Sequence, residues 1–496
     1  MKINSKAKTG AISALVLGMI LVGCGGTTTT TTAAASGPKK NVIFFLGDGM
    51  GMTTLTAARI YSVGEAGNLT IDTLPDTAFV KTFSNDAQVT DSAPSMAAYM
   101  TGVKTNNEVI SMSPNTVATS PSADANGNLT INNCAANNGT SAKTLLELAK
   151  AKGWATGAIT TTELTHATPA ATYSHICNRN AAYHIAAQLI PNGAGYNKAL
   201  TNGSDMGVDV LMGGGLNHFT PYSTSNTKGR ADGRDLTAEL AALGYTVAKT
   251  KADMLAAPNN VKLIGLYSKT SHLEYDLDRL AQVAAGTGNG VTQPSLAEMT
   301  TKAMDILSSG PNGYFLMVEG GRIDHALHST IAKKALQDTV AFDNAIKAAI
   351  DKAKLTDPTL ANTLIVVTAD HDHTLVLNGY AQRTGKTTAT NPGVLGLVKN
   401  YVTGLFDLDA DSTPYSIIGF GNGENRNATR AGLAITEATT SADLYHQEAV
   451  IQTAVGSETH GGTDVFLGAM GMGSSNFYGS IDNTKVFQLV KTAAGL

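Results

Sequence analysis

The sequence predicts an α/β protein in which helices flank a doubly wound, mostly parallel central sheet, with one loop-rich insertion. Apolar runs of strand length alternate along the chain with segments of helical periodicity, as in parallel sheets. Several of these runs end in glycine-rich loops. The length of 496 residues suits one large domain with insertions, or two or three ordinary domains.

The composition excludes several classes of protein. Charged residues make up 15% of the chain, below the roughly 25% of an average globular protein. Three cysteines are too few for a disulfide scaffold, and a mean hydropathy of −0.02 argues against many membrane spans. The net charge of −4 offers no basic surface for nucleic acid, so we expect no nucleic-acid partner.

The N-terminus is predicted to be an export signal rather than part of the fold. Residues 1–23 combine a basic start with an apolar run at 11–22, which is short for a stable membrane span. The segment Leu21-Val22-Gly23-Cys24 resembles the bacterial lipobox, in which the cysteine is lipidated; the alternative is a plain signal peptide. Residues 24–38 are rich in Thr, Ala and Gly and suit a flexible tether.

Export implies a location in the bacterial periplasm or on the cell surface, with a lipid anchor at Cys24 holding the protein to a membrane. In such an oxidising compartment Cys134 and Cys177 can pair, although two separate thiols remain the alternative because the sequence does not give their distance.

The folded part is predicted element by element from hydrophobic periodicity, caps and glycine positions. The expected elements are a strand at 41–46 with a glycine-rich loop at 47–51, a helix at 53–63, a helix from about residue 92, a helix at 142–152, strands at 154–161 and 209–215, a helix at 296–308, a strand at 314–318, a helix at 330–354 and a strand at 363–368. Residues 375–450 break the alternation and are read as an insertion.

Acidic and histidine residues follow three of these strands directly. Asp48 follows the first, Glu319 follows the strand at 314–318, and Asp370 with His371 follows the strand at 363–368. Ligands of open α/β sheets bind outside the carboxyl ends of the strands. Three separate stretches therefore bring metal-ligating side chains to one edge.

Two further patterns have the chemistry of metal sites. Asp324 and His328 are four residues apart, so in a helix they share one face and could bind one ion. Asp370 beside His371 offers the mixed oxygen and nitrogen donors typical of zinc, although a polar turn would have the same sequence.

Ser92 stands where a helix is predicted to begin, in the sequence Asp91-Ser92-Ala-Pro. The N-terminus of a helix has a positive field that favours an alkoxide and a bound phosphate. An ordinary serine N-cap is the alternative on local sequence alone.

Taken together, the motifs resemble those of alkaline phosphatases, and they occur in that family's order. The matching segments are Asp48-Gly-Met, Asp91-Ser92-Ala, His166-Ala-Thr168-Pro-Ala, Asn178-Arg179-Asn, Glu319-Gly-Gly-Arg-Ile-Asp324-His325-x-x-His328, Thr-Ala-Asp370-His371 and Glu-Thr-His460-Gly-Gly. His166 and His325 make the pattern similar to the animal-type enzymes. The resemblance covers residues 39–496 as one catalytic domain, with 375–450 resembling the family's crown insertion.

The resemblance implies a role for each matching residue. Ser92 would be the nucleophile, Arg179 would bind two phosphate oxygens, and Asp91 would orient the arginine. One zinc ion would take Asp324, His328 and His460, and a second would take Asp48, Asp370, His371 and Ser92. One magnesium ion would take Asp48, Thr168 and Glu319, with His166 and His325 just outside the ligand shell.

The implied activity is hydrolysis of phosphate monoesters through a phosphoserine, with broad specificity and an alkaline optimum. The partners would be small phosphomonoesters, inorganic phosphate and, by family analogy, a second copy in a homodimer. Two alternatives remain: a phosphodiesterase or sulfatase on the same scaffold, and a surface lipoprotein that binds metal or phosphate without turnover. The Arg of the sulfatase motif is missing after Ser92.

Overall fold

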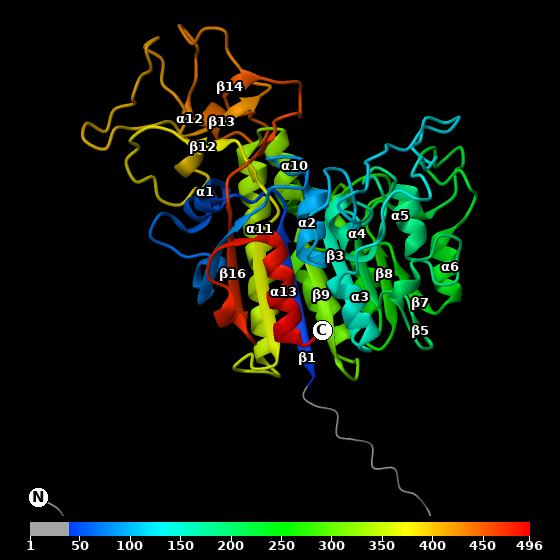
Figure 1. The fold of residues 1–496 in the computed structure, drawn as a ribbon. Coiled ribbons are helices and arrows are strands. Elements are labelled where there is room, and N and C mark those ends of the chain that lie inside the picture. Colours follow the sequence, from blue (N-terminus) through cyan, green and yellow to red (C-terminus); the bar gives the residue numbers. More distant parts are fainter. Residues whose placement is uncertain (1–38) are drawn as a thin grey trace, which may run out of the picture. The chain divides into compact units, whose positions relative to one another are not determined.

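The computed structural model describes residues 39–496, and these form a large sheet with helices packed on both faces (Figure 1). The predicted signal peptide, the tether and Cys24 lie outside the described residues. Within the described residues, none of the helices has the length and apolar character needed to cross a membrane.

The central sheet confirms the predicted α/β fold. Its strands, in order across the sheet, are β17 (Gly479–Asp482), β2 (Asp76–Lys81), β16 (Val465–Gly471), β10 (Thr363–Ala369), β1 (Lys40–Gly47), β9 (Gly313–Gly320), β3 (Ala155–Glu163), β6 (Val210–Gly214), β8 (Lys262–Leu266) and β7 (Tyr245–Ala248). Only β16 runs antiparallel to its neighbours, so the sheet is mostly parallel, as predicted.

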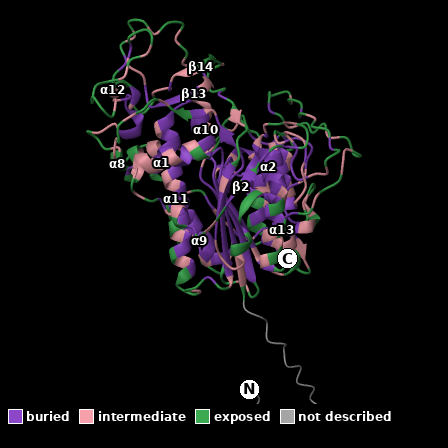
Figure 2. Cartoon of the chain, turned by 60° about the vertical axis from the view of Figure 1, so that its left-hand side comes forward, coloured by how far each residue is buried: buried purple, intermediate pink, exposed green. Residues whose placement is uncertain are grey.

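The helices cover the sheet on both sides, which is why its central strands are apolar throughout. Val42 to Leu46 of β1 are completely buried, and Figure 2 shows the middle of the sheet in the colour of buried residues. The helices are α1 (Met52–Val63), α2 (Ser92–Thr101), α3 (Leu145–Ala151), α4 (Ala167–Tyr173), α5 (Ala182–Gln188), α6 (Leu236–Ala242), α7 (Lys251–Ala256), α8 (Asp276–Ala285), α9 (Leu296–Leu307), α10 (Arg322–His328), α11 (Ala332–Lys354), α12 (Glu437–Thr440) and α13 (Asn483–Ala494).

The predicted helix at 330–354 begins two residues later than expected, at Ala332. Thr330 has a φ of 52°, in the left-handed region, and this ends the preceding turn and separates α11 from α10. Because α10 is a separate short helix, its residues Asp324 and His328 lie at the end of the sheet rather than along the body of α11.

The register of the three central strands aligns their carboxyl ends. Leu46 of β1 pairs with Glu319 of β9, and Gly47 pairs with Ala369 of β10. The residues that follow these strands therefore start from the same edge, as the sequence predicts.

The segment at 375–450 carries a small sheet of its own, at the top of Figure 1. Its strands are β12 (Leu375–Leu377), β13 (Ile418–Gly423) and β14 (Ala449–Gln452), in that order. Most of the segment between them is loop, and several large apolar side chains in it are exposed, among them Tyr401, Val402 and Leu405.

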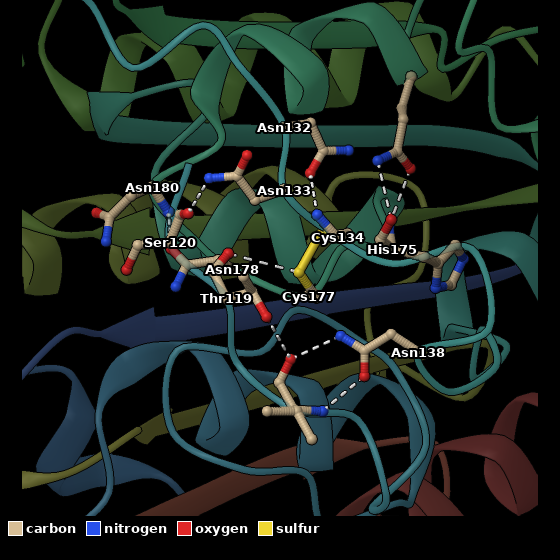
Figure 3. Close-up of a disulfide and its surroundings, with 12 residues drawn as sticks. Thr119, Ser120, Asn132, Asn133, Cys134, Asn138, His175, Cys177, Asn178 and Asn180 are labelled. Atoms are coloured by element: carbon tan, nitrogen blue, oxygen red, sulfur yellow. Dashed lines mark hydrogen bonds between the residues drawn. A yellow bond between two sulfur atoms is a disulfide. The ribbon is translucent and has the colours of Figure 1, made fainter. Parts of the chain in front are cut away.

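Cys134 and Cys177 are joined in a disulfide with a Cα–Cα distance of 5.8 Å (Figure 3). The bond ties the long loop between α2 and α3 to the segment that follows α4. Within that loop, Asn133 Nδ2 donates hydrogen bonds to Ser120 O and Ser122 Oγ, so part of it is held by its own side chains.

Candidate active site

The helix α2 places Ser92 at the carboxyl edge of the sheet. Asp91 is the N-cap, and its Oδ1 accepts a hydrogen bond of 2.7 Å from Ala93 N. Further along the helix, Ser95 Oγ and Tyr99 OH donate to Asp370 O and Ala369 O at 2.7 and 2.8 Å. These bonds fix the start of the helix against the end of β10.

Ser92 lies among the acidic and histidine residues that the sequence groups together. Its Oγ is 3.3 Å from Asp48 Oδ1 and 3.3 Å from His371 Nε2, and its side chain is buried. His371 Nε2 is also 3.3 Å from Asp370 Oδ2. Asp48, which follows β1, and His371, which follows β10, therefore both lie next to the hydroxyl of Ser92 at the start of α2.

A second group lies beside the first. Asp324 Oδ1 is 3.3 Å from His328 Nε2 and 3.6 Å from His460 Nε2, and these two nitrogens are 3.1 Å apart. Asp324 Oδ1 is also 4.0 Å from His371 Nε2, so the two groups adjoin.

The histidines of both groups have their tautomers set by backbone carbonyls. His328 Nδ1 faces Glu458 O at 2.5 Å, His460 Nδ1 faces Thr90 O at 2.9 Å, and His371 Nδ1 faces Asp372 O at 3.2 Å. A carbonyl only accepts, so each Nδ1 carries the hydrogen and each Nε2 presents a lone pair to the site. Two such lone pairs 3.1 Å apart, on His328 and His460, repel unless a cation or proton lies between them.

A third group is made of oxygen donors. Glu319 is completely buried, and its Oε2 bonds Thr160 Oγ1 and Thr162 Oγ1. Its other oxygen, Oε1, has no hydrogen-bond partner among residues 39–496, and neither do the buried Asp48 Oδ2, Asp370 Oδ2 and Thr168 Oγ1. Unpartnered buried oxygens are rare in folded proteins, so this part of the site fits hard divalent cations.

The pKa values of the buried acids also fit a site for divalent cations. Burial raises the pKa of Asp48 well above its usual range, and Asp324 and Glu319 raise it further. Burial likewise raises the pKa of Glu319 to about 7 and that of Asp370 to about 8. Carboxylates gathered in a dry site lack compensating positive charge, which bound divalent ions would supply.

Arg179 lies beside this centre. Its Nη1 is 3.3 Å from Asp91 Oδ1, and its Nη2 is 3.1 Å from His166 Nε2. Its backbone N donates to Glu108 O, and Glu108 N donates in turn to Asp91 Oδ2. Asp91 therefore orients the guanidinium directly, while the Glu108 backbone holds both Asp91 and the main chain of Arg179 in place.

His166 and His325 differ from the histidines of the first two groups, because in each of them one ring nitrogen accepts a hydrogen bond from an arginine. His166 Nε2 faces Arg179, and His325 Nδ1 accepts from Arg322 Nη1 at 2.8 Å. A guanidinium only donates, so the other nitrogen of each ring carries the hydrogen. His272 extends this cluster, with ring centroids 4.2 Å from His325 and 5.5 Å from His166. These rings can donate hydrogen bonds but offer no free lone pair to a metal.

His373 lies two residues beyond His371, and its role was not predicted from the sequence. Its Nε2 is 2.8 Å from Asp324 Oδ1 and its Nδ1 is 2.5 Å from Glu458 Oε2. Burial lowers its pKa, but the bonds to these carboxylates outweigh burial and raise it to about 10. Both nitrogens are occupied, so His373 orients Asp324.

Asp324 differs from the other buried acids. Burial raises its pKa, but His328 and His373 outweigh burial and hold the pKa well below the usual range. It therefore stays ionised between them. His373 could be found from sequence only by pairing β11 (Asp372–His373) with β15 (His460–Gly461), where His373 lies opposite His460.

Comparisons with known proteins show the family to which the chain belongs. The sequence matches the family model described as alkaline phosphatase over residues 39–496. It is 34% identical to the tissue-nonspecific alkaline phosphatase of Gallus gallus, covering 87% of this chain and 80% of that one, and 34% identical to the alkaline phosphatase of Gadus morhua, covering 87% of each.

Two solved structures share the fold. The alkaline phosphatase of Thermus thermophilus matches with a TM-score of 0.64 and 25% identity over 92% of each chain. The enzyme of the Antarctic bacterium TAB5 matches with a TM-score of 0.61 and 23% identity, over 92% of this chain and 98% of that one.

Proposed function

This chain belongs to the alkaline phosphatase family and is a phosphomonoester hydrolase, and on that premise we propose that it acts through a phosphoserine on Ser92 with two zinc ions and one magnesium ion. The observation that carries the proposal is the position of the Ser92 hydroxyl, 3.3 Å from a ligand atom of Asp48 and from one of His371.

The donor sets support the metal assignment. Nitrogen and carboxylate donors suit zinc: Asp324, His328 and His460 would hold one ion, and Asp48, Asp370, His371 and the Ser92 oxygen a second. The oxygen donors Asp48, Thr168 and Glu319 would hold magnesium, which prefers such ligands. A solved variant of the TAB5 enzyme contains bound magnesium in a site named M3. When bound, the ions supply positive charge and Lewis acidity to the reacting oxygens.

The residues of the chain perform the remaining steps. Ser92 Oγ forms a bond to phosphorus while the bond between phosphorus and the alcohol oxygen breaks. The serine hydroxyl gives up its proton, and the alcohol leaves with one proton gained. Water then attacks the phosphoserine, which returns the Ser92 hydroxyl and releases inorganic phosphate. Arg179 binds two oxygens of the transferring group, because its planar guanidinium matches their spacing, and Asp91 keeps it in place.

The same features support broad specificity and an alkaline optimum. The proposed contacts of Ser92 and Arg179 are to the phosphoryl group, which every monoester has in common. Glu319 and Asp370, with pKa values of about 7 and 8, lose their protons at alkaline pH and can then bind cations fully. His166 and His325 would position Arg179 and the magnesium ligands from outside the ligand shell.

We extend the proposal to the setting of the enzyme. The lipobox-like segment that ends at Cys24 supports export and a lipid anchor in the periplasm or at the cell surface. The exposed apolar side chains of residues 375–450, including Tyr401 and Val402, support a homodimer built through this segment.

The test is hydrolysis of a chromogenic phosphomonoester at alkaline pH by the purified protein, as isolated, after chelation, and after zinc and magnesium are restored. Activity should vanish on chelation, return with the metals and be absent in Ser92→Ala. The matched control is Ser174→Ala, which changes a buried serine whose hydroxyl has no partner. Full activity in Ser92→Ala would refute the phosphoserine mechanism.

A further inference from the structure

A cavity of about 470 Å³ adjoins Arg179 and His166, the two residues at the edge of the proposed phosphate site. This size is within the range of roughly 300–1,000 Å³ typical of small-ligand sites. Its other walls carry no role in the proposed mechanism, and they include Glu163, Asn217, His218, Tyr183 and Lys228. A monoester whose phosphate is bound by Arg179 has this space next to it.

Asn217 presents an unpartnered acceptor in this wall. The residue is only 4% exposed, and its Nδ2 donates to Lys228 O at 3.2 Å. Because that carbonyl can only accept, the amide cannot be turned around, and Oδ1 is left as the free group. Within residues 39–496, Asn217 Oδ1 has no hydrogen-bond partner, which is costly for a buried oxygen.

Glu163 presents a second acceptor. Its backbone N donates to His272 Nδ1, but its carboxyl group makes no hydrogen bond or ion pair with any of residues 39–496. Burial raises the pKa of Glu163 to about 7, so at alkaline pH it is a carboxylate that can only accept. An unpaired, half-buried carboxylate at the wall of a cavity is satisfied best by donors on a ligand.

Two other buried polar side chains of the wall, those of Tyr183 and His218, already have partners. Tyr183 OH donates to Lys228 O at 2.7 Å, and His218 Nδ1 bonds Thr165 Oγ1 at 2.8 Å. Burial and Arg230 lower the pKa of His218 to about 4, so it is neutral. The free hydrogen-bonding capacity of the buried wall is therefore mainly that of acceptors.

We propose that this cavity is a subsite for the alcohol part of the substrate, and that it favours phosphate monoesters of polyhydroxylated alcohols such as sugars. Hydroxyl groups would donate to Asn217 Oδ1 and to the Glu163 carboxylate, which an alkyl or aryl alcohol leaves unsatisfied. The inference rests on the proposed phosphomonoesterase function and refines its specificity, since any monoester still reaches Ser92.

The experiment compares kcat/KM for glucose 6-phosphate and n-hexyl phosphate, which have the same number of carbon atoms but differ in hydroxyl groups. The full chain is assayed with zinc and magnesium, as wild type, Glu163→Leu and Asn217→Leu. Glu274→Leu is the matched control, because Glu274 is a half-buried glutamate on the neighbouring loop that does not line the cavity. A chromogenic aryl phosphate reports the basic activity of every variant.

We expect wild type to favour the sugar phosphate by about ten-fold or more, and Glu163→Leu to reduce that ratio about ten-fold, as for loss of a hydrogen bond to a charged group. Asn217→Leu should reduce it by a smaller factor, and the control should keep the wild-type ratio. A wild-type ratio near one overturns the inference without any variant, as does a ratio that neither substitution changes. Absence of aryl phosphate hydrolysis would instead overturn the proposed function and the subsite with it.

Discussion

His373 offers the sharpest test of how the metal site is built, because it touches no proposed ion yet bonds one of the ligands. In His373→Ala the 2.8 Å contact to Asp324 and the 2.5 Å contact to Glu458 are both lost. Asp324 then keeps His328 and His460 as its nearest neighbours, at 3.3 and 3.6 Å. We expect the substitution to weaken zinc binding at Asp324, His328 and His460.

The magnitude follows from the bonds that are lost. A hydrogen bond to a charged group contributes about 1.5–3 kcal/mol, and loss of a residue that orients a metal ligand lowers metal affinity by about 10–100-fold. The two estimates agree, since ten-fold corresponds to about 1.4 kcal/mol. The metal-free protein should lose more, about 3–5 kcal/mol of stability, because two buried carboxylates lose their shared partner.

The assay is competition for zinc against a chelator of known affinity, together with urea unfolding of the metal-free protein. His446→Ala is the matched control, because His446 also pairs with a glutamate, Glu424, but lies in the insertion and outside the site. The reasoning is refuted if His373→Ala binds zinc as tightly as His446→Ala does.

Four further predictions test other parts of the structure. Arg179→Lys should lower kcat/KM for an aryl phosphate at least about ten-fold, because an ammonium cannot bind two oxygens in one plane; equal rates would refute this role. Metal binding at pH 7 should release about one proton or more, since Glu319 and Asp370 have pKa values of about 7 and 8, and calorimetry in buffers of different ionisation enthalpy measures it. The same groups bind more protons folded than unfolded, so chelated protein should lose stability as pH rises from about 4 to 8, and a flat or rising melting temperature would contradict this. Cys134→Ser with Cys177→Ser should cost up to about 4 kcal/mol in urea unfolding, given the sequence separation of 43 residues, and no change would show that the pair does not restrict the unfolded chain.

The parts of the fold that the sequence predicted are those buried on both faces. The strands β1, β9 and β10 read as continuous apolar runs, so their positions and the acids that follow them were visible. The strands β2 and β17 at one edge alternate or are short, and β16 joins them to β10 in the antiparallel sense. Their place in the sheet depends on pairing between distant segments, which local periodicity does not contain.

In the candidate site, too, some residues could be predicted from local sequence, and others depend on contacts between distant segments. Asp48 and Asp370 could be predicted because each follows a strand, and Glu319 because it lies at the end of β9; parallel strands end at one edge. The roles of His373 and Glu458 could not, because they arise from the pairing of β11 with β15 and from a contact across 85 residues of sequence. The unpartnered Asn217 oxygen likewise has no sequence signal, since only the position of Lys228 O fixes the amide orientation.

What separates a metal ligand from a hydrogen-bond donor in this centre is the partner of the second ring nitrogen. Histidines whose Nδ1 faces a carbonyl present a lone pair, and histidines that accept from a guanidinium present an N–H. The first kind comprises His328, His371 and His460, and the second comprises His166 and His325. Residue type alone cannot distinguish the two kinds, because all are histidines near acidic residues. The fold makes the distinction by placing a backbone carbonyl beside Nδ1 of each histidine of the first kind, which leaves Nε2 with a lone pair. It places an arginine beside the accepting nitrogen of each histidine of the second kind, which leaves no free lone pair.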